Sequence, residues 1–187
     1  MNIYETCPMI ENEDFLLRLV TIDDAENLLT VYSDEVAVPI FNSDNCRGDN
    51  FHYTTLARMR EIIDFWIYSY NEKIFVRFSI IDKRSQTAVG TIELFNRVSQ
   101  DAFNGCGIFR LDLRSDFEKS EIILSILNMI IPPAFELVHC MLIATKAIPT
   151  AAERISALNA FGFKRSAENL VGQDGTIYGD YFEIRCE

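Results

Sequence analysis

The order of apolar and polar runs in the second half of the chain predicts a unit made of strand, helix and strand. Residues 106–113 are mostly apolar, and a polar break follows at residues 114–116. An apolar run with helical periodicity extends from residue 117 to about residue 138, and a second apolar strand occupies residues 140–147. Because strand, crossover helix and strand form a βαβ unit, we expect the two strands to lie parallel with a right-handed crossover.

Two sequence patterns predict where the helices of this half begin. Ser115-x-x-Glu118 matches a capping box, whose side chains satisfy the first free amides of a helix, and it predicts that the long helix starts at Asp116. Thr150-x-x-Glu153 is a second capping box, and it predicts a short helix that stops at Gly162. Ligands of βαβ units usually bind where the first strand ends and the helix begins, which here is residues 113–121.

The same patterns predict the other elements of the chain. In order, they are a strand at residues 15–19, a helix capped by Thr21 that reaches Tyr32, a long loop at residues 34–53, a helix from Thr54 or Thr55, a hairpin of strands 74–81 and 88–96, and a last hairpin of strands 163–171 and 176–184 that turns near residues 173–175. Gly90 lies inside a predicted strand, where glycine often marks a bulge or a close backbone approach.

This order of elements predicts an α+β fold. We expect a mixed, mostly antiparallel sheet with one central parallel pair and helices on both faces. The length of 187 residues indicates a single domain over residues 1–187, with its core at about residues 15–184.

The charge of the chain limits its partners. Seventeen Lys and Arg against 28 Asp and Glu give a formal net charge of −11, so we expect neither nucleic acid nor an anionic membrane as a partner. The acidic surface either attracts a cationic amine or only keeps the protein soluble, and the sequence leaves both open. The start of the chain lacks the basic and apolar regions of a signal peptide. The sequence contains no run of about 18 apolar residues, so we expect no membrane span.

The five cysteines are scattered and form no C-x-x-C pair. This spacing argues against structural zinc and against a disulfide framework. Reduced thiols in a cytoplasmic protein fit the pattern better.

Four short motifs occur in the order and at the spacing of a known superfamily. They are residues 15–19 with Thr21 to Ala25, Val89-Gly90-Thr91-Ile92, Ala134-Phe135-Glu136, and the helix end at residues 157–163. In this arrangement the chain resembles the GNAT N-acyltransferase superfamily over residues 15–184. It is similar to the branch that acetylates the N-termini of ribosomal proteins.

The resemblance implies acetyl-CoA as donor and a small-molecule or peptide amine as acceptor. We expect no metal. In this superfamily the pantetheine chain lies along the backbone of the strand that here carries Leu111 and Leu113. The diphosphate binds the loop and helix start that follow, which here carry Arg114, Lys119 and Ser120. The resemblance also implies that an amide near residues 111–113 stabilises the oxyanion of the reaction.

The expected diphosphate loop departs from the superfamily pattern. Glu118 stands at the position of a Gln or Arg, and Lys119, Glu121 and Ile123 stand where small residues are usual. Leu158 replaces the tyrosine that many members use as general acid. The sequence therefore supports two hypotheses: an acyl-CoA-dependent N-acetyltransferase, and a non-catalytic GNAT-like domain that binds a ligand or a protein and has lost acyl-CoA.

Acyl transfer to an amine needs a base that takes the ammonium proton. Glu93, in the middle of an apolar strand, is the first candidate, and Asp112 is the second. Either carboxylate is alternatively a solvent-facing or Arg-paired strand residue.

The acceptor site is expected on the long loop and the last hairpin. His52 and Tyr53 in the loop, and Tyr178 on the hairpin, are the candidate substrate-binding residues. Cys106 and Cys140 begin neighbouring strands, where buried packing is favoured over a role as thiol nucleophile. A homodimer through the final strands is compatible with the pattern.

Overall fold

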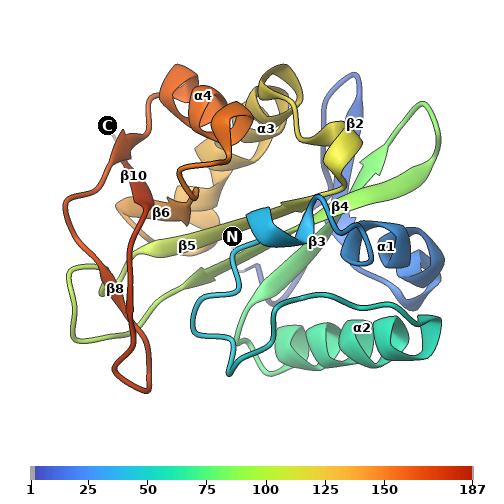
Figure 1. Ribbon diagram of the computed structural model, residues 1–187, viewed down its shortest axis with the longest axis horizontal. Coiled ribbons are helices and arrows are strands. Elements are labelled where there is room, and N and C mark those ends of the chain that lie inside the picture. The colour runs from blue at the N-terminus through green and yellow to red at the C-terminus, as the bar shows by residue number, and fades with distance from the viewer. Residues whose placement is uncertain (1–2, 187) are drawn as a thin grey trace.

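The computed structural model describes residues 3–186 and contains one large mixed sheet (Figure 1). Its strands lie in the order β1-β2-β3-β4-β5-β6-β10-β7. The strands are β1 (Ile10–Glu11), β2 (Phe15–Leu19), β3 (Val76–Asp82), β4 (Thr87–Asn96), β5 (Gly107–Leu113), β6 (Leu142–Lys146), β7 (Lys164–Arg165) and β10 (Tyr181–Arg185). Neighbouring strands are antiparallel except for β5 and β6, which are parallel. The predicted fold class is confirmed.

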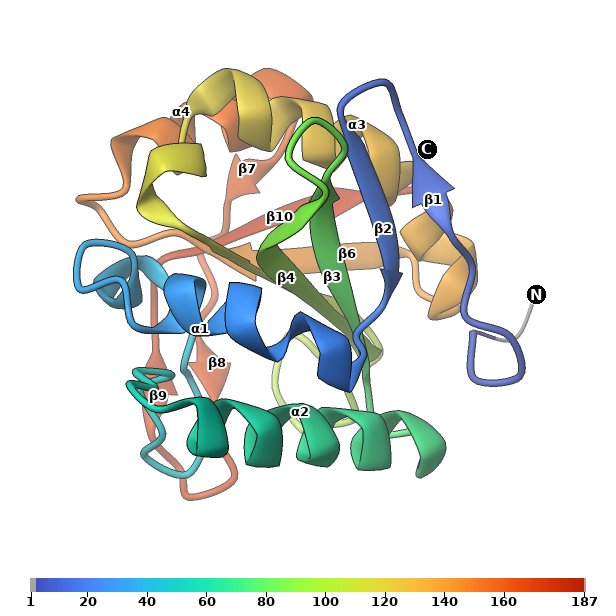
Figure 2. The ribbon, with the colours of Figure 1, turned by 90° about the vertical axis from the view of Figure 1, so that its right-hand side faces the viewer.

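Helices cover both faces of this sheet (Figure 2). One face carries α1 (Ala25–Tyr32) and α2 (Leu56–Asn71), and the other carries α3 (Ser120–Leu137) and α4 (Ala152–Phe161). Three short 3-10 helices complete the list: η1 (Ile22–Asp24), η2 (Val38–Ile40) and η3 (Ser115–Phe117). The start of α2 was predicted correctly, since the Thr55 hydroxyl accepts a hydrogen bond from the Arg58 amide.

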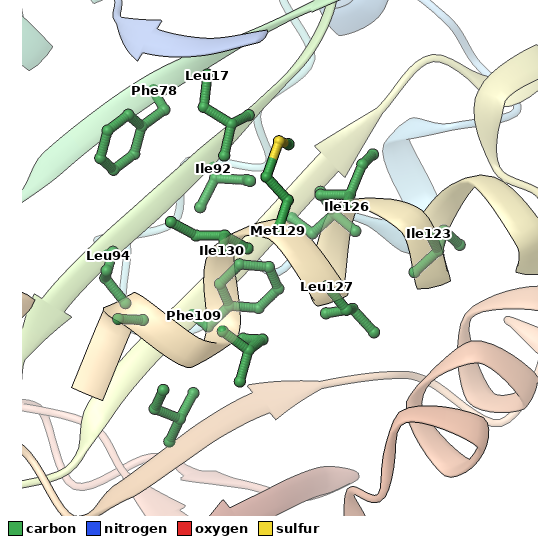
Figure 3. Packing of buried hydrophobic residues seen from close by; sticks show 14 of the residues in the cluster. Leu17, Phe78, Ile92, Leu94, Phe109, Ile123, Ile126, Leu127, Met129 and Ile130 are labelled. Atoms are coloured by element: carbon green, nitrogen blue, oxygen red, sulfur yellow. The ribbon is translucent and has the colours of Figure 1, made fainter. Parts of the chain in front are cut away.

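The apolar stripe of α3 forms the centre of the larger core (Figure 3). Ile123, Ile126 and Ile130 of this helix are buried in one cluster with Phe78 and Phe109 of the sheet. By length and composition alone α3 is a candidate membrane span, contrary to the expectation that no such segment exists. Its apolar side chains are those of a core helix, because they are buried against the sheet rather than exposed.

Gly90 of β4 lies at a β-bulge toward β3 and in close contact with the backbone of β5. The register between β3 and β4 shifts between Ile80 and Ile81, opposite this glycine. A Cβ atom at Gly90 would overlap the carbonyl oxygen of Asp112 and lie 2.8 Å from Cδ2 of Leu113. Both predictions for Gly90, the bulge and the close approach, are confirmed.

Both capping-box predictions are wrong. α3 begins at Ser120 rather than Asp116, its N-cap is Lys119, and neither it nor α4 has a side-chain cap. The two glutamates of the predicted boxes bind elsewhere: the Glu118 carboxylate accepts hydrogen bonds from Arg154, and the Glu153 carboxylate accepts one from the Ser120 amide. Tertiary partners have replaced the local ones.

The last hairpin is also corrected. Its predicted long strands are interrupted, and β8 (Leu170–Val171) pairs with β9 (Ile177–Tyr178) in a separate two-stranded sheet. β10 pairs with β6 along its whole length and with β7 at two positions. The turn itself is where it was expected, with Gly175 at a φ of 83°.

Candidate functional site

The two parallel strands of the sheet pair over only part of their length. β5 and β6 are paired at Gly107–Ile143 and Ile108–Ala144, so the rest of β5 diverges from β6. Leu111 and Leu113, the predicted donor-binding residues, lie on this diverging part of β5. The backbone groups on this side of β5 are not paired with β6. Buried backbone donors and acceptors outside a ladder need other partners.

One of these backbone groups is bound by an arginine from α4. Nη1 of Arg154 donates a hydrogen bond to the carbonyl oxygen of Leu111 at 2.8 Å. Nε and Nη2 of the same guanidinium donate to the two carboxylate oxygens of Glu118 at 2.7 and 2.8 Å. Arg154 is buried, with 2% of its surface exposed, and links α4, β5 and the segment before α3.

The first amide of α3 is bound by Glu153, the residue before Arg154 in α4. The Ser120 N–H donates to Oε2 of Glu153 at 2.8 Å, and the hydroxyls of Ser120 and Ser156 lie 3.2 Å apart. Free amides at a helix N-terminus bind anions, and here a carboxylate of the chain has that position. Neither Glu153 nor Arg154 was predicted as a site residue. The sequence signal for Arg154 was its position on the same helix face as the apolar residues Ala151, Ala157 and Leu158.

The two basic residues predicted near the donor position lie differently. Arg114 donates from Nε and Nη2 to the Asp116 carboxylate at 2.6 and 2.9 Å. This hydrogen-bonded ion pair lowers the pKa of Asp116 and raises the pKa of Arg114. Lys119 is exposed at the N-cap of α3, so it is the more accessible of the two.

The two candidate bases are buried on the opposite face of the sheet, around Arg77. Glu93 accepts hydrogen bonds from Arg77 on one oxygen and from Nη1 of Arg110, at 2.6 Å, on the other. Asp112 uses a single oxygen, Oδ2, which accepts from Nη1 of Arg77 at 3.1 Å and from the Tyr32 hydroxyl at 2.8 Å. The network joins β3, β4, β5 and α1.

These partners give the two carboxylates opposite electrostatics. Burial alone raises the pKa of a carboxyl, but the guanidiniums of Arg77 and Arg110 hold the pKa of Glu93 below its usual value. For Asp112 burial outweighs the attraction of Arg77, so its pKa is raised. Its Oδ1 has no hydrogen-bond partner among residues 3–186. Asp112 therefore keeps an oxygen that can take a proton, whereas both Glu93 oxygens are occupied.

The long loop between α1 and α2 is tied to the strands of the site through Asp44. Its backbone carbonyl accepts from Nη2 of Arg110 at 2.8 Å, Oδ1 accepts from Lys146 at 2.7 Å, and Oδ2 accepts from the Tyr181 hydroxyl at 3.1 Å. This role of Asp44 was not predicted, because the residue lies among turn formers in the sequence. The loop is thus fixed to β5, β6 and β10.

The three predicted acceptor-binding residues belong to two separate places. His52 and Tyr53 line a surface hollow of about 660 Å³ together with Arg47 and Arg58. Within it His52 is exposed, while Tyr53 is buried and donates to Asp49 at 3.0 Å. Tyr178 packs instead with a third apolar cluster, where its ring lies under Lys146 at 5.9 Å. The structure does not gather the three residues around one ligand.

A second hollow, of about 600 Å³, lies between residues 97–101 and the β8–β9 hairpin. Arg110 and Phe95 line it, and the Arg110 guanidinium lies 5.5 Å from the Phe95 ring. Asp101 holds its two walls together: it is ion-paired with Arg97 and accepts the Val171 amide at 2.7 Å.

The Asp101 contacts predict a loss of stability in acid. Burial alone would raise the pKa of Asp101, but Arg97 and two backbone amides hold it well below its usual value. Because the folded state binds this proton less tightly than the unfolded state, the contribution is complete above about pH 4 and is lost as the pH falls. Asp101→Asn is therefore expected to flatten the acid limb of the unfolding midpoint measured from pH 6 to pH 2. An unchanged acid limb would contradict this assignment.

The remaining candidates for chemistry are the cysteine thiols and any group of metal ligands. Cys106 and Cys140 are buried, and burial raises the pKa of Cys106 to about 12, so packing rather than nucleophilic attack describes them. Within residues 3–186 no group of three His, Cys, Asp or Glu side chains has the arrangement of a metal site.

The chain matches no family model and no curated protein by sequence. Solved structures with the same fold are numerous. One is ribosomal-protein-S5-alanine acetyltransferase from Vibrio fischeri, 18% identical, with a TM-score of 0.68 over 94% of each chain. Another is Mycobacterium smegmatis RimJ in complex with CoA-disulfide, 14% identical, with a TM-score of 0.72 over 96% of this chain and 88% of that one. A GNAT-family acetyltransferase from Bacillus anthracis is 13% identical, with a TM-score of 0.69 over 95% and 98%.

These likenesses confirm the GNAT fold that the sequence motifs indicated. The structural neighbours are acetyltransferases, and the RimJ structure holds a CoA derivative. At such low identity the likeness extends to the fold and not to the chemistry of individual residues.

Proposed function

We propose that this GNAT-fold chain transfers an acetyl group from acetyl-CoA to a primary amine. The observation that carries the proposal is the pair of backbone groups beside α4. The Leu111 carbonyl lies on the part of β5 that diverges from β6, and the Ser120 amide opens α3. A strand edge for pantetheine and a helix N-terminus for diphosphate are the two features that such a donor requires.

The residues present accept an anion at this place. The Ser120 amide already binds the carboxylate of Glu153, which takes the position that we propose for a diphosphate oxygen of acetyl-CoA. We assign donor binding to the backbone of Leu111 and Leu113 and to Ser120, with Lys119 and, once released from Asp116, Arg114 as the nearby cations. Acetyl-CoA supplies the activated thioester carbonyl. The chain positions this carbonyl and supplies the base that accepts the amine proton.

The proton acceptor is one of the two buried carboxylates. We keep Glu93 and Asp112 as candidates and favour Asp112, because its Oδ1 is unpaired among the described residues and burial raises its pKa. A base with a pKa nearer the working pH is the more effective one, provided that the amine reaches it.

Asp112→Asn is expected to lower kcat about 100-fold and to leave the affinity for CoA unchanged. Glu93→Gln is the matched comparison, because it also removes one buried carboxylate from the Arg77 network. Steady-state acetylation of an amine panel measures kcat, and calorimetry measures CoA affinity. Full turnover in Asp112→Asn together with an inactive, folded Glu93→Gln would assign the base to Glu93 instead.

A second candidate function is a non-catalytic domain that binds a ligand or a protein without acyl-CoA. The acids around the donor position favour it: Glu118 and Glu153 occupy the diphosphate side, and Glu121 is exposed in the first turn of α3. Like charges disfavour a diphosphate at this place. Calorimetric titration with CoA separates the two functions.

The remaining assignments follow from charge and thiol chemistry. We place the protein in the cytoplasm, with a small-molecule or peptide amine as acceptor and neither nucleic acid nor membrane as a partner. His52 and Tyr53, which line one hollow, remain proposed acceptor contacts, and Tyr178 is a separate candidate because it lies elsewhere. A homodimer through the last strands is part of the same proposal, and sedimentation of the purified chain tests it.

A further inference from the structure

Two consecutive residues of α4 have opposite charges and separate partners at the donor position. Glu153 binds the Ser120 amide, and Arg154 binds Glu118 and the Leu111 carbonyl. We propose that the donor diphosphate exchanges with these two carboxylates, and that Arg154 is the side chain that binds the diphosphate in place of a glycine-rich loop. The inference rests on the proposed function, because it concerns the same donor site.

The first exchange takes place at the start of α3. The Ser120 amide is satisfied by one carboxylate oxygen of Glu153, whose side chain is otherwise exposed. An incoming diphosphate oxygen offers this amide the same kind of acceptor with more charge, and anions are favoured at helix N-termini. When Glu153 leaves, its carboxylate moves into water, so no buried charge is left unpaired.

The second exchange takes place on the guanidinium. Arg154 has both a carbonyl of β5 and the carboxylate that precedes α3 within hydrogen-bond distance, so it lies between the pantetheine and diphosphate positions. Arginine binds phosphate and carboxylate with the same two-pronged geometry. A diphosphate that replaces Glu118 leaves Arg154 paired with an anion, which avoids the cost of an uncompensated buried charge.

The exchange explains how a loop without glycine serves a diphosphate. The usual loop brings backbone amides close to the phosphates, and glycine permits that approach. Here Lys119, Glu121 and Ile123 stand at those positions, and the buried guanidinium of Arg154 provides the donors instead. It follows that Glu118 and Glu153 are internal competitors of the donor.

Calorimetric titration with CoA and with inorganic diphosphate tests the inference. Glu153→Gln is expected to bind CoA about fivefold more tightly than the wild type, and Glu118→Gln is expected to bind it more tightly as well. Glu118→Gln/Arg154→Met replaces the ion pair by uncharged side chains, and it is expected to bind both probes about tenfold or more weakly than Glu118→Gln. Glu26→Gln, on α1 at the other face of the sheet, is the control for charge alone.

Thermal unfolding of each variant confirms that it is folded before titration. Equal affinity of Glu118→Gln and the double variant would remove Arg154 from the site, and an unchanged affinity in Glu153→Gln would remove the competition. Absence of CoA binding in every variant would overturn both the inference and the proposed function. The predicted order of affinities without transfer to any amine would sustain the role of Arg154 and reject the acetyltransferase.

Discussion

Arg77→Met is expected to lower the free energy of unfolding by about 3–5 kcal/mol. Arg77 is buried, is ion-paired with Glu93 and Asp112, and lies with its guanidinium 4.3 Å from the Trp66 ring. Removing the positive charge leaves two carboxylates buried at one place, with Glu93 still paired to Arg110 and Asp112 without an ion-pair partner among the described residues. Denaturant unfolding followed by circular dichroism measures the change.

Two further variants separate the buried network from charge in general. Arg84→Met removes an exposed guanidinium from the turn between β3 and β4, and it is expected to change the stability by less than about 0.5 kcal/mol. Adding Asp112→Asn to Arg77→Met is expected to restore part of the lost stability, because it removes one unpaired charge. If Arg77→Met were as stable as the wild type, the network would not hold the site together.

Gly90→Ala is the second substitution with a large expected effect, a loss of about 3 kcal/mol. The added methyl group would meet backbone and side-chain atoms of Asp112 and Leu113, and Leu113 is buried. Because these atoms belong to β5, relief of the overlap must shift the strand that carries the proposed donor contacts. We therefore expect weaker CoA binding together with a lower unfolding midpoint.

Gly175→Ala is the matched control for this substitution. Gly175 has no atom within 4 Å of the added methyl position, but its φ is 83°. The stability lost in Gly175→Ala is expected to equal the cost of alanine in a left-handed conformation, about 1–2 kcal/mol, with CoA binding unchanged. A loss at Gly90 no larger than the loss at Gly175, with CoA binding unchanged, would mean that β4 and β5 accommodate the methyl group and would contradict the close contact at Gly90.

The fold followed from the sequence because local patterns and tertiary packing agree. The apolar stripe of α3 and the strands on either side of it are long and periodic, so they predicted the βαβ unit correctly. The prediction of the last hairpin was wrong because its strands are short and the longest of them, β10, pairs with β6. Strand pairing between distant segments leaves little trace in a local pattern.

The site was only partly predictable for a related physical reason. Glu93 was recognised as a candidate base because it is a charged residue within an apolar strand. The same argument applied to Arg77 in β3 and to Arg154 in α4 would have indicated both residues. The capping-box pattern predicted the wrong partners for Glu118 and Glu153, since a carboxylate that fits a local amide also fits a distant guanidinium or amide.

Calorimetric titration of the wild-type chain with acetyl-CoA and CoA, at moderate ionic strength, tests the central claim most directly. The proposed acetyltransferase predicts saturable binding of both, with dissociation constants in the micromolar range that weaken as salt rises, because diphosphate contacts dominate. Absence of binding up to millimolar CoA would contradict the claim. It would instead support a GNAT-fold binding domain whose donor site is permanently filled by Glu153 and Arg154.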